Sequence, residues 1–363
     1  MSTLDTRAGS RSEGAPAGIA ANRTRATARW VAFVGLLVLL GSLLAHLSLT
    51  IHPRFLNFAD SVDSQKAILE RRPFVFGGES VDYVSWRSRV LVPYAIAGLS
   101  RATGLRFSQS YLAVHWLTAI AALGAFALLA ARQVRRDWRF AGIAASLLTV
   151  VLLPTFLHIY EIPSDFADAG FFALLTLLAL ERRRGWFVLV LLIALANRES
   201  AIFSLLIWFC GHDRPLWSRA SITEGVFCAI VAAVGMGLVF WLRLHFAVVT
   251  NAPVAEAVKQ PVMPSSVPLS QLRDFLRHPY WGGALFFLFG YLVFFTAVLT
   301  AGWRELPVRF RRSALAAAVI FGLSIPFANL PELRVYIPSL VLVTLAVVAL
   351  LPRSLEAAPA PRL

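Results

Sequence analysis

The sequence predicts an all-α membrane protein, a polytopic transmembrane helical bundle with about 9–10 membrane segments, two of which form a re-entrant or broken helix pair. Of its 363 residues, 58% are hydrophobic and only 15% are charged, which is far from the composition of a soluble globular domain. Several apolar runs reach about 18 residues, the length that crosses a bilayer. Arginine residues gather between these runs, as they do beside transmembrane helices.

The net charge of +14 is explained by membrane orientation, and we expect membrane lipids and no nucleic acid as partners. Only two of the 34 basic residues, Lys66 and Lys259, are lysines, and no motif for binding RNA or DNA accompanies them. The two cysteines, Cys210 and Cys228, lie in apolar runs and have neither metal-ligand nor disulfide spacing.

Seven apolar runs are predicted to span the membrane, and a shorter run and a broken pair complete the bundle. The seven cover residues 30–51, 108–131, 140–157, 225–242, 280–303, 313–330 and 335–351. The shorter run covers 166–180, and the broken pair covers 186–196 and 201–210. We expect a disordered cytoplasmic tail over 1–29, a single transmembrane domain over 30–352 and a short cytoplasmic tail over 353–363.

Arginine clusters set the predicted orientation, because links rich in Lys and Arg stay on the cytoplasmic side. They lie in the N-terminal tail and in the links 132–139, 182–184 and 304–312. For these to share a side, the apolar stretch 90–99, which contains Pro93 and is half as long as a span, must lie along the outer interface. The first periplasmic loop then covers 52–107 and the second covers 247–279. The N-terminus is expected in the cytoplasm, and the chain in a bacterial inner membrane.

The segment 186–210 decides how often the chain crosses the membrane. One continuous helix would place Arg198 and Glu199 in mid-bilayer, where charges are costly, and would move the 304–312 cluster outside. A helical hairpin bent at Asn-Arg-Glu-Ser keeps that cluster inside, with arms of about 16 Å that reach half-way through the bilayer core. We therefore predict the hairpin.

Charged side chains in the first outer loop are the first candidates for a site. Asp60, Asp63, Glu79 and Asp82 offer carboxylates that take a proton from a substrate hydroxyl or hold a divalent metal, although an ordinary solvated loop also carries such charges. Arg87 and Arg89 precede the interfacial segment, where a guanidinium either binds phosphate or anchors an amphipathic helix.

The next outer link, 158–168, carries four more candidates. His158, Glu161, Asp165 and Asp168 suit metal ligation. Alternatively, Asp165 is the N-cap of the following helix and Asp168 is an acid in its first turn.

The hairpin bend and the last outer link carry similar chemistry. Arg198 and Glu199 are either functional or paired with each other, with Asn197 as the cap of the second arm. Glu332 and Arg334 suit either a substrate site or the start of a helix.

No GxSxG, Walker A, HExxH or GxGxxG segment occurs, so the motifs of common hydrolases, NTPases, zinc proteases and dinucleotide-binding enzymes are missing. A first transmembrane helix, a large outer loop that opens with Asp residues, and many spans with short links together resemble the GT-C superfamily of membrane glycosyltransferases. Short segments resemble recurring elements of a bacterial GT-C-like group, although Ser64 stands where that group has Gly. These segments are 63–68 (DSQKAI), 82–93 (DYVSWRSRVLVP), 160–165 (YEIPSD), 197–200 (NRES) and 332–338 (ELRVYIP).

The resemblance implies a GT-C-like fold and inverting transfer of a sugar from a polyprenyl-phosphate carrier to an acceptor. The family's first-loop acid maps to Asp63 or Asp60, which would act as the general base or help to position the acceptor or a metal. The substrate and phosphate would be bound by Arg87, Arg89, Asn197, Arg198, Glu199, Glu332 and Arg334, with Asp82, His158, Glu161 and Asp165 in support. The cofactor stays unassigned; a divalent cation, Mg²⁺ or Mn²⁺, would use Asp60, Asp63 and Glu161.

Two other functions stay open at this point. A transporter or lipid flippase would use intramembrane Arg and Glu as a path through the full thickness of the bundle, although no inverted repeat is evident. A non-catalytic membrane subunit would retain a GT-C-like scaffold without its chemistry.

Overall fold

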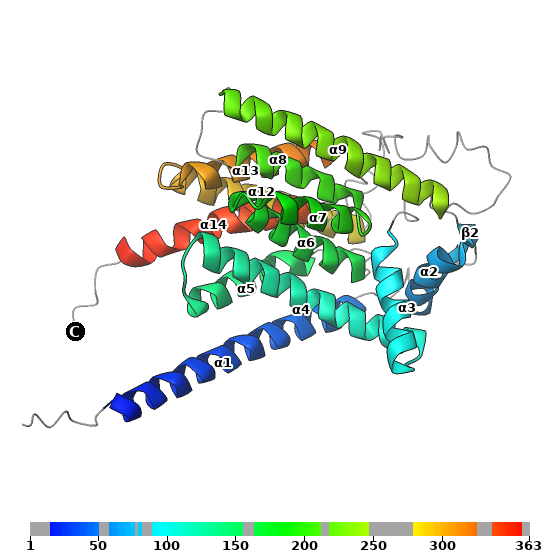
Figure 1. Ribbon diagram of the computed structural model, residues 1–363, viewed down its shortest axis with the longest axis horizontal. Coiled ribbons are helices and arrows are strands. Elements are labelled where there is room, and N and C mark those ends of the chain that lie inside the picture. Colours follow the sequence, from blue (N-terminus) through cyan, green and yellow to red (C-terminus); the bar gives the residue numbers. More distant parts are fainter. Residues whose placement is uncertain are drawn as a thin grey trace, which may run out of the picture.

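A computed structural model describes residues 15–50, 58–76, 79–81, 89–154, 163–211, 218–246, 279–324 and 336–357 (Figure 1). It confirms the predicted all-α bundle. The elements in chain order are α1 (Ala15–Thr50), α2 (Phe58–Glu70), β1 (Phe74–Phe76), β2 (Glu79–Val81), α3 (Leu91–Thr103), α4 (Phe107–Gln133), α5 (Trp138–Leu152), α6 (Pro163–Leu180), α7 (Arg184–Leu195), the 3₁₀ helix η3 (Glu199–Phe203), α8 (Ser204–Cys210), α9 (Arg219–His245), α12 (Pro279–Gly302), α13 (Val308–Ser324) and α14 (Ile337–Ala357). The strands β1 and β2 form a short antiparallel hairpin within the first outer loop.

The apolar runs form helices close to their predicted limits. In the described part of the chain, four helices are long and apolar enough to cross a membrane. They cover Thr27–Leu49, Phe107–Gln133, Pro163–Leu180 and Arg219–His245. Five shorter apolar helices accompany them, so the chain is a multi-pass membrane protein.

The predicted disordered tail over 1–29 is wrong in its second half, because α1 begins at Ala15. Residues 15–29 are rich in Ala and Arg, which are among the best helix formers. They continue directly into an apolar helix, so they extend an existing helix and need no nucleus of their own. At the other end α14 continues to Ala357, five residues beyond the predicted limit of the transmembrane domain at 352.

The centre of the bundle is the contact between α4 and α6, which α1, α5 and α14 surround. Small residues allow the close approach: a Cβ at Gly170 would lie 3.2 Å from the Cα of Ala122. A Cβ at Gly41 of α1 would likewise lie 2.9 Å from the Cα of Ile120 on α4. Close backbone contacts of this kind are a common way for membrane helices to associate by van der Waals packing.

The predicted hairpin over 186–210 is confirmed. The ring centroids of Phe187, near the start of α7, and Trp208, near the end of α8, lie 4.7 Å apart. A continuous helix would separate these residues by about 30 Å at 1.5 Å per residue. The contact is closed by Arg182, whose Nη1 donates to the Trp208 carbonyl at 2.6 Å.

The basic links lie at one end of the bundle, as predicted. Arg309, beside the α12–α13 link, donates to the side chain and the carbonyl of Gln133 at 3.2 and 2.9 Å. Arg184 at the start of α7 forms an ion pair of 2.7 Å with Glu224 in the second turn of α9. We call this the basic end.

The helices α2 and α3, from the predicted first outer loop, lie at the opposite end beside the end of α9 (Figure 1). The helix α3 lies across the direction of the bundle helices, so the prediction that 90–99 does not span the membrane is confirmed. It ends at Gly104, whose φ of 72° is the left-handed conformation that glycine adopts most readily. We call this the polar end.

Candidate functional site

A buried cluster of charges lies at the polar end, where the first turns of α6 meet the hairpin bend. The Nη1 of Arg198 donates to Oδ1 of Asp165 at 2.6 Å and lies 3.7 Å from Oδ2 of Asp168. The three side chains are only 6%, 2% and 2% exposed, respectively. Charges so deeply buried persist only when they are paired, because each loses its hydration.

Both acids occupy the start of α6 for a local reason. Pro163 is the first helical residue, a position that suits proline because its missing N–H is not needed there. Asp165 therefore lies inside the first turn, and its predicted role as N-cap is wrong because the helix begins two residues earlier. Asp168 follows three residues later on the same face, so both carboxylates point toward Arg198.

The hairpin bend supplies the other side of the cluster. Arg198 has an extended backbone, with φ −161° and ψ 137°, which ends the helical run of α7. The Ser200 hydroxyl donates to Asp168 at 3.1 Å. The Asn197 Nδ2 donates to the Ser164 carbonyl at 2.9 Å, so the prediction that Asn197 caps the second arm is wrong. Its amide joins the bend to α6 instead.

Arg198 and Glu199 do not pair with each other, contrary to one of the predicted alternatives. Glu199 accepts a hydrogen bond of 2.9 Å from Nη2 of Arg243 near the end of α9. Adjacent residues in an extended segment point to opposite sides, so Arg198 reaches α6 while Glu199 reaches α9. Arg243 was not among the residues predicted for the site, although its position at the end of a long apolar run could have indicated it.

The predicted general base, Asp63, lies on α2 at the same end of the bundle. Arg72 donates to both of its carboxylate oxygens, at 2.5 and 3.1 Å, and also to Glu70 at 2.7 Å. These two carboxylates raise the pKa of Arg72 above its ordinary value. Asp63 is 35% exposed, which leaves it accessible to a substrate. Asp60 precedes it by less than one turn, in the first turn of α2.

Arg89 connects the first outer loop to the buried cluster. It lies within electrostatic range of Asp168. Two residues on, the Leu91 N–H donates to the Ala196 carbonyl at 3.0 Å, which fixes the start of α3 against the hairpin bend. Val90 between them packs with Ile68, Leu242 and Phe246 in a small apolar cluster. The start of α3, the hairpin bend and the end of α9 therefore contact one another directly.

Two polar atoms beside the cluster lack a partner among the residues that the structure describes. They are Oδ1 of Asn197 and Oγ of Ser164, both buried. Buried polar atoms are nearly always satisfied by protein, water or ligand. The site therefore retains hydrogen-bonding capacity that its own side chains do not use.

The predicted divalent cation finds no ligand set in the described ranges, where no three His, Cys, Asp or Glu side chains gather. Acids of the polar end form ion pairs with arginines instead: Asp63 pairs with Arg72, and Asp165 pairs with Arg198. The predicted residues Asp82, Arg87, His158, Glu161, Glu332 and Arg334 lie outside the described residues.

The bundle and its covered polar end define a multi-pass helical membrane protein. The fold is similar to that of ArnT from Cupriavidus metallidurans, a GT-C glycosyltransferase. The apo structure of that protein has a TM-score of 0.52 and 18% identity to this chain, and the match covers 91% of this chain. Its structure bound to undecaprenyl phosphate has a TM-score of 0.51 and 20% identity, with 90% covered.

The chain spans 62% of the length of ArnT in both comparisons. No family model matches the sequence, and no curated protein matches it. The comparisons therefore establish the GT-C-like fold.

Proposed function

We propose that this chain is a GT-C-type glycosyltransferase that moves a sugar from a polyprenyl-phosphate-linked donor to an acceptor. The observation that carries the proposal is the buried Asp165–Arg198–Asp168 cluster at one end of a bundle that shares its fold with a protein that binds undecaprenyl phosphate. A buried ion pair is a poor source of stability, so its presence favours a functional reason.

The reaction assigned to this site is an inverting transfer. The acceptor hydroxyl oxygen attacks the anomeric carbon of the sugar, and the bond from that carbon to the phosphate oxygen breaks. The phosphate leaves with the electron pair, and the hydroxyl proton passes to a carboxylate. We assign the carboxylate to Asp63, with Asp60 as the alternative, because the Arg72 contact orients Asp63 and leaves it accessible.

The donor phosphate requires cationic donors that are not already saturated by carboxylates. Arg198 donates to Asp165 and lies beside Asp168, so we propose that it positions the bend instead of holding phosphate. Arg89 and Arg71 are the described candidates for the phosphate. Arg71 lies at the exposed end of α2, within 2.9 Å of Nε2 of His245.

A transfer assay with the full-length protein in proteoliposomes tests the proposal. The probes are undecaprenyl-phosphate-linked sugars with a labelled sugar and a panel of acceptors. We expect Asp63→Asn to slow transfer about 10²–10⁴-fold, the usual contribution of a general base. Asp137→Asn is the matched control, because Asp137 caps α5 at the basic end and Asn retains that cap.

Loss of transfer in Asp60→Asn but not in Asp63→Asn would move the base to Asp60. Full transfer in both variants would refute a carboxylate base in this loop. Binding of undecaprenyl phosphate without any transfer would instead make the chain a non-catalytic membrane subunit.

We further propose that the polar end faces the periplasm of a bacterial inner membrane and that the N-terminus is cytoplasmic. The arginine-rich links at the basic end support this orientation. Single cysteines at Ser61 and Arg183, in a variant without Cys210 and Cys228, test it with a membrane-impermeant reagent. Labelling of Ser61→Cys from outside and of Arg183→Cys only after permeabilisation is expected, and the reverse pattern would invert the topology.

A further inference from the structure

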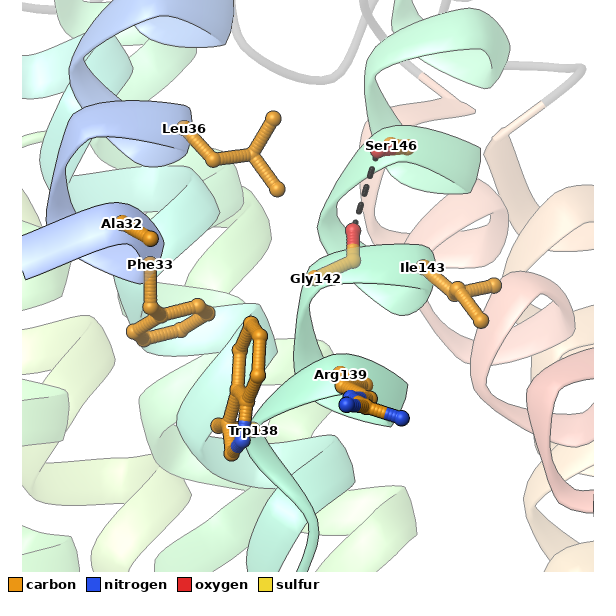
Figure 2. Close-up of a pocket in the computed structure, with 8 residues that line it drawn as sticks. All are labelled: Ala32, Phe33, Leu36, Trp138, Arg139, Gly142, Ile143 and Ser146. Atoms are coloured by element: carbon orange, nitrogen blue, oxygen red, sulfur yellow. Dashed lines mark hydrogen bonds between the residues drawn. The ribbon is translucent and has the colours of Figure 1, made fainter. Parts of the chain in front are cut away.

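A groove opens between α1 and α5 at the basic end of the bundle, on the side of the molecule and away from the polar site. It has a volume of about 370 Å³, within the range of small-molecule pockets. Phe33 and Leu36 of α1 form one wall, and Trp138, Gly142 and Ile143 of α5 form the other (Figure 2).

Gly142 has no side chain, so the Leu36 side chain of α1 approaches α5 closely at this point. A Cβ at Gly142 would lie 3.1 Å from Cδ2 of Leu36, so a larger residue here would displace the Leu36 side chain. The one hydroxyl on the wall, that of Ser146, donates to the Gly142 carbonyl of its own helix at 3.0 Å (Figure 2). The wall of the groove extends along roughly 10 Å of α5, from residue 139 to 146 at 1.5 Å per residue, and beyond Arg139 it is apolar.

The mouth of the groove is cationic. Arg139 is exposed, and its Cζ lies 5.5 Å from the centroid of the Trp138 ring. Arg29 lies one turn before Phe33 on the same face of α1, and Arg135 and Arg136 precede α5. Asp137 is the acid of this link, and its carboxylate is engaged by the Arg139 N–H at the start of α5.

We propose that this groove binds an anionic phospholipid, with one acyl chain between α1 and α5 and the phosphate at Arg139 and Arg29. Charge complementarity identifies the occupant: an apolar slot lined by Phe and Leu suits a hydrocarbon chain, and Arg139 on its wall, with further arginines nearby in the sequence, suits a phosphate. Trp138 lies between the two, where tryptophan usually marks the boundary between hydrocarbon and headgroups.

Native mass spectrometry of the full-length protein in detergent tests the proposal. The probes are phosphatidylglycerol and phosphatidylcholine with identical acyl chains. We expect tighter binding of phosphatidylglycerol, and a loss of roughly fivefold in its affinity in Arg139→Gln, as for one arginine at a membrane surface. Arg101→Gln, an exposed arginine at the end of α3, is the control and should bind as the unsubstituted protein does.

Variants that fill the groove distinguish lipid binding in the groove from general attraction of anionic lipid to the protein surface. Gly142→Leu should abolish the preference for phosphatidylglycerol, whereas Gly237→Leu, where a Cβ meets nothing within 4 Å, should retain it. If Gly142→Leu does not fold, Ala32→Phe fills the slot from an exposed position on α1. Equal binding of both lipids would overturn the proposal. So would a preference that survives both filling variants, or a protein dimer that forms through this groove and excludes lipid.

Discussion

Replacing Arg198 with Met removes the cation that neutralises two buried carboxylates. Its Nη1 lies 2.6 Å from Asp165 and 3.7 Å from Asp168. At an effective dielectric constant of ~20 these attractions are worth about 6 and about 4.5 kcal/mol. Removing the guanidinium also recovers its own desolvation cost, which is several kcal/mol. We therefore expect the free energy of unfolding to fall by about 3–5 kcal/mol, the range for breaking a buried ion pair.

The measurement is an unfolding titration of the full-length protein in detergent micelles, followed by circular dichroism. Arg72→Met is the control, because the Arg72–Asp63 pair is 37% and 35% exposed and is worth at most about 1 kcal/mol. The double variant Arg198→Met with Asp165→Leu removes one positive and one negative charge. Asp168 then still has the opposite charge of Arg89 nearby.

We expect this double variant to regain most of the lost stability, since apolar replacement of a buried pair is often neutral. A single variant that loses no more than Arg72→Met, or a double variant less stable than the single one, would refute the reasoning.

Substitutions of Gly211, Arg243 and Trp208 test the hairpin and its neighbours in the same unfolding titration, with Gly237→Ala as a control. Gly211→Ala should lower the free energy of unfolding by about 1–3 kcal/mol, because the new Cβ would lie 2.6 Å from a backbone oxygen of the preceding turn. Gly237→Ala lies in open space and should raise the free energy of unfolding by about 0.5–1 kcal/mol. Equal effects of the two substitutions would contradict the geometry. Arg243→Gln should cost about 1.5–3 kcal/mol through the lost bond to Glu199, and exchanging the two charges should restore part of it. Trp208→Ala should cost about 3–5 kcal/mol, and a negligible loss would argue against the closed hairpin.

Hydrophobic length and arginine position predicted most of the architecture from the sequence. The hairpin followed because a continuous helix would have moved one arginine cluster to the wrong side, and the contact between Phe187 and Trp208 confirms it. The apolar stretch 90–99 was too short to span, and α3, which contains it, does lie across the end of the bundle. Both results depend on the length of an apolar segment and on the arginines beside it, which can be read from that segment alone.

The partners of the charged residues could not be predicted in this way. Arg198 binds Asp165, which is 33 residues away in the chain, and Glu199 binds Arg243, which is 44 residues away. Only the packing of α6 and α9 around the bend determines these pairs. Arg72 was overlooked because it follows the predicted acid by nine residues, beyond the end of α2, and reaches back to it across the helix end.

The pairing also changes which arginines are available to a phosphate. Arg198 pairs with Asp165 and lies beside Asp168, so it offers little attraction to an anion. An exposed cation at the same end of the bundle is Arg71, whose Cζ lies 5.4 Å from the centroid of the Phe246 ring. A donor phosphate bound there would lie beside α2, on the side of the carboxylate assigned as base. The buried cluster then acts as the rigid support of the bend, and the phosphate and the acceptor meet on the surface above it.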